Sequence, residues 1–364
     1  AMTRSLTPQA LHAAATRPLE LADEGYFWVG AQRLGTPGGT LPSGQMYVEY
    51  RIPRHLRQPW PIVMIHGGGG QGLDYLATPD GRPGWVSWFL DQGYAVYLVD
   101  RHGHGRAPFH TDIQGPMAPP IPYEFIVNFF TAPKQAGQWP RADRHTQWPS
   151  EGTIGDPIVD QFMCSAGPAL ADGERSHAEM GRCGGELLDA IGPAILMTHS
   201  AGGPSGWMIA DARPQLVKAI LAVEPIGPPF AQRGPVNLKW GLTEAPLTYD
   251  PPAARPEDLQ HVVKTPSNPE LMPCEVQAEP ARRLPNLCGF PIGVVTAEAS
   301  WMAHDNHGIV DYLTQAGATV EHLRLEEFGI RGNGHAMMLE RNSDEVAAAL
   351  NGWIISKGLA EAGQ

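Results

Sequence analysis

Cysteine is scarce in this sequence. The four cysteines, Cys164, Cys183, Cys274 and Cys288, are widely spaced and form no C-x-x-C pair. We therefore expect no zinc site, and no other metal. Two interpretations of the cysteines stay open. They form two disulfides, with Cys164–Cys183 and Cys274–Cys288 as the short-loop pairings, or they are four buried thiols of a cytosolic protein.

Long apolar runs and positive charge are also lacking. No segment approaches the roughly 20 apolar residues of a membrane-spanning helix, so we expect no membrane span. Lys and Arg number 26 against 38 Asp and Glu, which gives a net charge of −12. This balance argues against nucleic acid or an anionic membrane as a partner. The N-terminus shows no charged segment followed by an apolar one, so no signal peptide is predicted. The compartment (periplasmic or secreted, or cytoplasmic) and a homodimer stay open.

Short apolar segments alternate with amphipathic ones along most of the chain. The segments that predict strands are PIVMIH at 61–66, 94–100, AILMTH at 194–199, VKAILAVE at 217–224, 290–298 and 319–327. The segments that predict helices are 83–92, 174–190, 202–212, 306–317 and 343–358, the last capped by Ser343. Buried strands that alternate with helices predict an α/β fold, with a mostly parallel central sheet covered by helices on both faces.

Two long segments break this alternation. Residues 107–172 are rich in proline and aromatic residues and show no sustained period, and residues 226–288 are polar and proline-rich. Both follow the carboxyl end of a predicted strand, where open α/β sheets place their ligand sites. We predict one domain over 1–364, with a lid or cap at 107–172 and a second irregular insertion at 226–288.

A serine lies in a tight, glycine-rich turn in the segment 196–207, LMTHSAGGPSGW. Ser200 would stand between a strand and a helix with its Oγ exposed, as in the nucleophile motif G-x-S-x-G. Thr198 replaces the first glycine, whereas Gly202 and Gly203 leave room on the other side of the turn. We expect Ser200 to be a nucleophile, and the Thr198 hydroxyl to steady the catalytic loops by a hydrogen bond. An ordinary glycine-rich junction is the alternative.

The segment IVMIHGGGG at 62–70 ends in free glycines. Their backbone N–H groups can bind an oxyanion. We expect Gly68 and Ala201 to donate, with Gly69 as a lesser candidate. A phosphate-binding loop is the alternative. No Lys-Ser/Thr pair follows, but Asp100 ends the next strand, so a dinucleotide site stays open.

A base and an acid are needed to activate a serine. His335, in GIRGNGHAMMLER, follows the last predicted strand, where the base falls in the chain order serine, acid, histidine. For the acid, two glutamates close apolar strands, Glu224 and Glu298, and position alone favours Glu298 slightly. The remaining histidines of interest are assigned structural roles: His66, His199, His102 and His104.

Seven segments, in order along the chain, resemble the α/β-hydrolase superfamily, and within it a bacterial esterase group typified by an Alcaligenes esterase. They are GYFWVG, QMYVEYRIP, IVMIHGGG, TPDGRPGWVSWFLDQGYAVYLVDRHGHGR, LMTHSAGG, AILAVEP and GIRGNGHAMMLERN. In that group a hydroxyl residue also stands where Thr198 stands. Two adjacent cysteines of the group are replaced here by Gly68 and Gly69. The two long insertions match poorly, so the resemblance does not name a substrate.

The resemblance implies Ser200 as the nucleophile, His335 as the base and Glu224, in place of Glu298, as the acid. Together with the residues it predicts a serine carboxylesterase that acts through an acyl-enzyme and needs no cofactor. The alternatives are an amidase or acyltransferase with the same triad, or a non-catalytic ligand-binding relative. The partner would be a small ester with an apolar or aryl portion.

Overall fold

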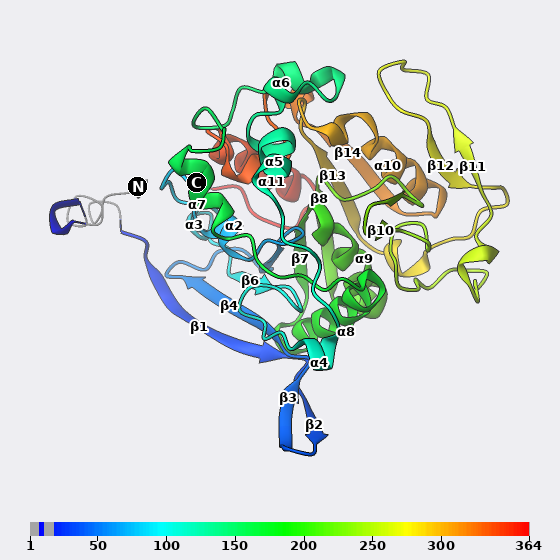
Figure 1. Cartoon of the computed structure of the whole chain (residues 1–364), viewed down its shortest axis with the longest axis horizontal. Coiled ribbons are helices and arrows are strands. Elements are labelled where there is room, and N and C mark those ends of the chain that lie inside the picture. Colours follow the sequence, from blue (N-terminus) through cyan, green and yellow to red (C-terminus); the bar gives the residue numbers. More distant parts are fainter. Residues whose placement is uncertain (1–6, 11–17, 364) are drawn as a thin grey trace.

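The computed structural model describes residues 7–10 and 18–363 and is built around an eight-stranded sheet (Figure 1). In sheet order the strands are β1 (Leu21–Val29), β4 (Met46–Pro53), β6 (Val96–Asp100), β5 (Ile62–Ile65), β7 (Ala194–His199), β8 (Val217–Val223), β13 (Pro291–Thr296) and β14 (Thr319–Arg324). β4 runs antiparallel to β1 and β6, and the pairs from β6 through β14 are parallel. The predicted fold class, an α/β protein with a mostly parallel sheet, is confirmed.

Side chains alternate between two hydrophobic cores, one on each face of the sheet. On β5, Val63 and Ile65 belong to one core, and Ile62 and Met64 belong to the other. This alternation follows from the two-residue period of a strand. Because both sets are buried, the central strands are apolar throughout, which is why they are recognisable as short apolar runs.

Helices cover both faces of the sheet (Figure 1). α8 (Gly173–Ile191), α9 (Gly203–Ala212) and α10 (Asn306–Gln315) contribute to the first core, and α3 (Trp85–Asp91) and α11 (Ser343–Ser356) to the second. The short helix α2 (Leu73–Leu76) contributes Tyr75 to the second core. Each predicted long helix therefore exists within a few residues of its expected bounds.

Three local expectations need correction. α11 is not capped by Ser343: its N-cap is Asn342, and the buried Ser343 hydroxyl instead accepts a hydrogen bond from Arg82 (3.1 Å). The strands expected to end at Glu224 and Glu298 end at Val223 and Thr296, so both glutamates stand beyond their strands. A hairpin of β2 (Gln32–Thr36) and β3 (Gly39–Ser43), which extends away from the sheet, was not expected (Figure 1).

The two insertions contain only short elements among their described residues. Residues 107–172 form α4 (Thr111–Gln114), α5 (Tyr123–Ile126), a π-helical turn (Val127–Thr131), α6 (Pro133–Ala136) and α7 (Pro157–Met163). Residues 226–288 form two hairpins, β9 (Gln232–Arg233) with β10 (Val236–Asn237), and β11 (His261–Lys264) with β12 (Cys274–Gln277). Such short elements have no sustained period, which explains why the sequence patterns did not resolve them.

All four cysteines are free thiols, so the disulfide pairings Cys164–Cys183 and Cys274–Cys288 do not form. Of the four buried thiols expected in the alternative interpretation, only Cys183 and Cys274 are buried; Cys164 is exposed and Cys288 is partly buried. The Cys183 thiol donates to the Gly44 carbonyl (3.4 Å). Cys183 and Cys274 fill the interior as small apolar side chains.

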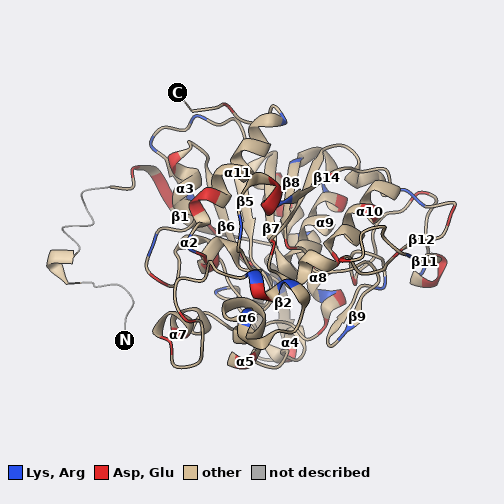
Figure 2. Cartoon of the chain, turned by 90° about the horizontal axis from the view of Figure 1, so that it is seen from above, with Lys and Arg blue, Asp and Glu red and all other residues tan. Residues whose placement is uncertain are grey.

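Within residues 7–10 and 18–363, no helix combines the length and the apolar character that crossing a membrane requires. Figure 2 shows the Lys and Arg residues interspersed with Asp and Glu along the ribbon.

Candidate active site

Ser200 occupies a strained turn between β7 and α9. Its φ of +53° is a left-handed value that non-glycine residues rarely adopt. The turn is tight, because a Cβ on Gly202 would lie 2.2 Å from the His66 carbonyl oxygen, and a Cβ on Gly203 would lie 2.8 Å from the Pro225 Cβ. Glycine is therefore required on the helix side of the serine, as expected from the sequence.

The prediction that the Thr198 hydroxyl steadies the catalytic loops by a hydrogen bond is wrong. The Thr198 side chain is fully buried, and its hydroxyl has no hydrogen-bond partner among the described residues. Its γ-methyl instead faces Gly206 on α9, where a Cβ would lie only 3.0 Å away. The residue thus serves packing between the strand and the helix.

This arrangement makes Thr198→Val a stabilising substitution. Valine keeps the shape of threonine and removes an unpaired buried hydroxyl, so we expect the free energy of unfolding to rise by about 1 kcal/mol, with unchanged turnover. Chemical denaturation measures it. The matched control is Thr296→Val on β13, since the Thr296 hydroxyl bonds Asn306 (2.9 Å) and His322 (2.8 Å) and its loss should destabilise the fold. A Thr198→Val protein destabilised as much as the control would contradict the packing role.

Three of the predicted site residues form one chain of hydrogen bonds. His335 Nε2 lies 2.8 Å from Ser200 Oγ, and His335 Nδ1 lies 2.9 Å from a Glu224 carboxylate oxygen. His335 and Glu224 are fully buried. Glu298, the alternative acid, lies elsewhere: its carboxylate accepts from Arg331 (2.6 Å) and from the Gly332 N–H (3.2 Å).

Burial shapes the titration of this pair. It lowers the pKa of His335 to about 3, while the charge of Glu340 pulls that pKa in the opposite direction. Burial also raises the pKa of Glu224 well above its usual range, and hydrogen bonds from the Ser300 hydroxyl and the Ala297 N–H (3.0 Å) counteract this effect. The imidazole is therefore neutral at ordinary pH, in the form that can accept a proton. Once it has taken that proton, the imidazolium 2.9 Å from Glu224 favours the charged form of the carboxylate.

The lowered pKa of His335 predicts activity that persists in mild acid. A base with a lowered pKa stays unprotonated as the pH falls, so the acid limb of kcat/KM for ester hydrolysis should lie well below pH 6.5, the ordinary histidine value. Stability must be measured at each pH, because burial also lowers the pKa of His66 and His199 to about 3. Their neutral burial costs stability progressively below pH 6.5. An acid limb at or above pH 6.5 in folded protein would contradict the expectation.

The glycine loop after β5 lies against the serine turn. A Cβ on Gly67 would lie 3.1 Å from the Ser200 Cβ, and a Cβ on Gly68 would lie 3.1 Å from the Ala201 Cβ. The Gly68 N–H makes no hydrogen bond to another described residue. Gly69, the lesser candidate, has a φ of +65° and packs against Ile121. The two expected oxyanion donors are thus neighbours, and one of them is free.

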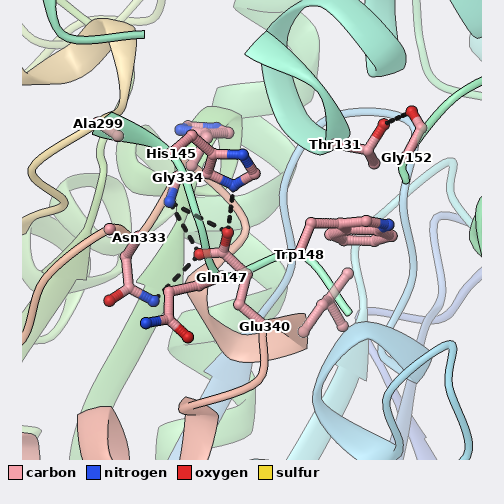
Figure 3. Close-up of polar contacts among 12 residues, drawn as sticks. Thr131, His145, Gln147, Trp148, Gly152, Ala299, Asn333, Gly334 and Glu340 are labelled. Atoms are coloured by element: carbon pink, nitrogen blue, oxygen red, sulfur yellow. Dashed lines mark hydrogen bonds and ion pairs between the residues drawn. The ribbon is translucent and has the colours of Figure 1, made fainter. Parts of the chain in front are cut away.

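The loop that carries His335 is held by a carboxylate that the sequence analysis did not assign. Fully buried Glu340 accepts hydrogen bonds from the Gly334 N–H (2.8 Å) and from Asn333 Nδ2 (3.1 Å). His145, from the first insertion, lies 2.6 Å from the same carboxylate (Figure 3). Glu340 follows an apolar run in a loop, which was an available signal. His145 lies in an aperiodic segment and offered none.

Both insertions line a cavity of about 990 Å³ that contains Ser200. Its walls are largely aromatic and aliphatic, with Phe125, Phe129 and Phe130 from the first insertion and Trp301 from the loop after β13. Trp301 and Phe130 also pack on His335, with ring centroids 4.1 and 4.9 Å from its imidazole. Neither residue was predicted from the sequence to contact the base.

Three of the four histidines expected to be structural make backbone contacts, whereas the His102 ring lies near the Glu179 carboxylate (3.9 Å). His66 Nε2 accepts from the Arg101 N–H (2.8 Å), and His199 Nε2 lies 2.8 Å from the His335 carbonyl. His104 Nδ1 lies 3.1 Å from the His102 carbonyl. The first two thereby connect the ends of β5, β6 and β7 with the loop that carries His335.

Two competing ligand interpretations find little support. Asp100, the candidate for a dinucleotide ribose, is already engaged by the Gly72 N–H (2.8 Å) and by Arg106 (2.8 and 3.0 Å).

His102, Glu179 and Cys183 offer atoms within 4.8 Å of one another that could hold a metal ion. Arg182 binds Glu179 (2.5 Å), and burial raises the pKa of the Cys183 thiol to about 12. Both effects oppose a cation there, and the expectation of no metal stays a prediction.

Comparison with known proteins supplies a family context. No family model matches the chain. The chain is 42% identical over 321 residues to a fungal protein named "Probable secreted lipase phiG", and the match covers 87% of each protein. A solved structure described as a novel bacterial esterase superposes with a TM-score of 0.59 at 23% identity, covering 94% of this chain and 98% of that one. The second likeness concerns the fold alone.

Proposed function

Because the chain belongs to the α/β-hydrolase family of esterases and lipases that includes the fungal lipase, we propose that it is a serine carboxylesterase acting through an acyl-enzyme. The observation that carries the proposal is the hydrogen-bond chain from Ser200 through His335 to Glu224, set in an apolar cavity. This is the arrangement of a nucleophile, a base and an orienting acid.

In this mechanism Ser200 Oγ attacks the ester carbonyl while His335 Nε2 takes its proton. Glu224 holds the Nδ1 proton, which fixes the tautomer of the ring and stabilises the imidazolium. The Gly68 and Ala201 N–H groups bind the oxyanion, each contributing on the order of 3 kcal/mol to transition-state stabilisation. His335 then protonates the leaving alcohol, and a water activated by the same base releases the acid.

The size and the aromatic walls of the cavity support an ester with an apolar acyl or alcohol portion. Residues 107–172 would act as the lid over this cavity, since they supply much of its wall. We also propose that the chain belongs, within this family, to the bacterial esterase group typified by an Alcaligenes esterase. The secreted fungal relative supports an extracellular setting.

Paired substrates test the proposal against its alternatives. We expect p-nitrophenyl esters to be turned over, with kcat/KM rising from acetate to longer acyl chains, and the matching p-nitroanilides to be turned over far more slowly. Added alcohol or amine should not divert most of the acyl group. Faster anilide cleavage would favour an amidase, dominant transfer would favour an acyltransferase, and no turnover of either substrate would favour a non-catalytic relative.

A further inference from the structure

Arg101 is a buried cation without a counter-ion. It directly follows β6, it is 3% exposed, and its Nε and Nη1 atoms have no hydrogen-bond partner among the described residues. No carboxylate oxygen of those residues lies within 4.0 Å of its guanidinium. Burial lowers its pKa only to about 10, so it stays charged at neutral pH. A buried charge is costly unless a partner compensates it, so a missing anion is indicated.

The groups around Arg101 do not supply that anion. Burial, and to a lesser extent the charge of Arg101, lowers the pKa of three nearby imidazoles, His66, His104 and His177, so all three are neutral at ordinary pH. His177 Nδ1 accepts the Glu244 N–H (2.9 Å), which leaves the proton of the neutral ring on Nε2. His177 lines the same cavity as Arg101 and so offers a second donor there.

This cavity is the one that contains Ser200. Arg101 follows β6 and Ser200 follows β7, with β5 between them. Two strand spacings separate the two positions by roughly 10 Å. One small molecule of this length can therefore place an ester at Ser200 and a second group at Arg101.

Two carboxyl groups line this cavity without pairing with Arg101. They are Asp74 and Glu244, and burial raises the pKa of each to about 7. Both are partly protonated at neutral pH, which weakens the repulsion that an incoming anion would meet. At neutral pH the Arg101 guanidinium is thus fully charged, whereas these two carboxyl groups are only partly charged.

From these observations we propose that the cavity accepts esters that also carry a carboxylate, and that Arg101 binds this carboxylate. A guanidinium matches a carboxylate with two parallel hydrogen bonds, and it does so best where water is excluded. The proposal rests on the proposed esterase function for the ester group. Binding of the carboxylate does not require turnover, so the two can be tested separately.

The test measures binding by calorimetry in a Ser200→Ala background. The probes are monomethyl adipate, which carries one carboxylate, and dimethyl adipate, its neutral counterpart. We expect the monoester to bind about tenfold to a hundredfold more tightly, and Arg101→Met to remove this preference. Arg101→Lys should keep part of it, because it keeps the charge. In the parent protein, the p-nitrophenyl monoester of adipic acid should exceed p-nitrophenyl hexanoate in kcat/KM by a similar factor.

Arg233 provides a matched control. It also lines the cavity, but it is ion-paired with Asp305 (3.3 Å) and hydrogen-bonded to the Gly227 carbonyl. Arg233→Met should leave the preference for the monoester intact. Without ligand, Arg101→Met should raise the melting temperature, because it removes an unpaired buried charge, whereas a structural arginine would lower it.

Equal binding of the two adipate esters, a preference for the diester, or no binding of either would overturn the proposal. The same holds for a preference that survives Arg101→Met. If the carboxylate site fails while p-nitrophenyl hexanoate is still hydrolysed, the esterase assignment stands. If binding follows Arg101 while no ester is turned over, the esterase assignment fails and the anion site stands.

Discussion

Ser200→Ala is expected to lower kcat for ester hydrolysis by about a millionfold, the effect of removing the nucleophile from a triad that works as a unit. The serine Oγ is the atom that forms the acyl bond, and alanine leaves His335 with nothing to deprotonate in the first step. The residual rate should come from the Gly68 and Ala201 donors and from substrate binding. Steady-state kinetics on a p-nitrophenyl ester measure the loss.

Ser205→Ala is the matched control for this substitution. Ser205 lies on α9, five positions further along the chain, is fully buried, and has a hydroxyl with no partner among the described residues. It should keep the parent kcat. Circular dichroism and the unfolding midpoint check that Ser200→Ala is folded. A folded Ser200→Ala protein with more than about a tenth of the parent kcat would contradict a nucleophilic Ser200. Such a loss would correspond to less than about 1.4 kcal/mol in the activation free energy, far too little for the loss of a nucleophile.

Glu224→Gln is expected to lower kcat by about a thousandfold to ten-thousandfold, with a smaller change in KM. Glutamine removes the negative charge that stabilises the imidazolium, and its amide can turn an N–H toward Nδ1 and select the wrong tautomer. The positive φ of Glu224, +50°, also shows that the backbone holds this residue in an unfavourable conformation at the end of β8. Such strain is kept where the surrounding structure fixes a side chain in place.

Glu298→Gln separates this effect from the loss of any buried glutamate. Glu298 lies just beyond β13, the strand next to β8, and is also buried, but its partners are Arg331 and Gly332. This variant should lose stability and keep kcat within a few-fold. If Glu298→Gln lost turnover and Glu224→Gln did not, the assignment of the acid would be reversed.

Much of the fold was predictable because its central strands are buried on both faces. Segments such as Ile62–Ile65 and Ala194–His199 are apolar throughout, and the helices between them are long enough to show a period. The two insertions were not predictable in detail. Their elements are two to seven residues long and owe their conformation to contacts with distant segments, such as Thr146 with Gly332 (3.0 Å).

The predictable part of the site consists of residues at the ends of strands. Ser200, Glu224 and His335 carry a local signal, namely a turn, a polar residue after an apolar strand, or a glycine-flanked loop. Choosing between Glu224 and Glu298 needed the resemblance, because both glutamates follow a buried strand and position alone favoured the other one. The two glutamates differ in which of them reaches His335, and this depends on side-chain conformation and three-dimensional distance, which the position in the sequence does not give.

Apart from Glu340, the remaining residues of the site are recognisable only in three dimensions. Arg101 follows a strand like many other residues, and its unpaired state depends on where every carboxylate of the fold lies. Trp301 packs on His335 although they are far apart in sequence, and Phe130 reaches the same ring from the first insertion. What identifies Trp301 and Phe130 is their common contact with His335, which no local sequence pattern shows.

Covalent labelling with a fluorophosphonate tests the central claim most directly, because the reagent reacts with an activated serine. Peptide mass spectrometry should find one phosphonyl adduct, on the peptide that contains Ser200. The adduct should be absent in Ser200→Ala and form far more slowly in His335→Ala. Labelling at another residue, or labelling of Ser200 at an unchanged rate in His335→Ala, would contradict a serine activated by His335.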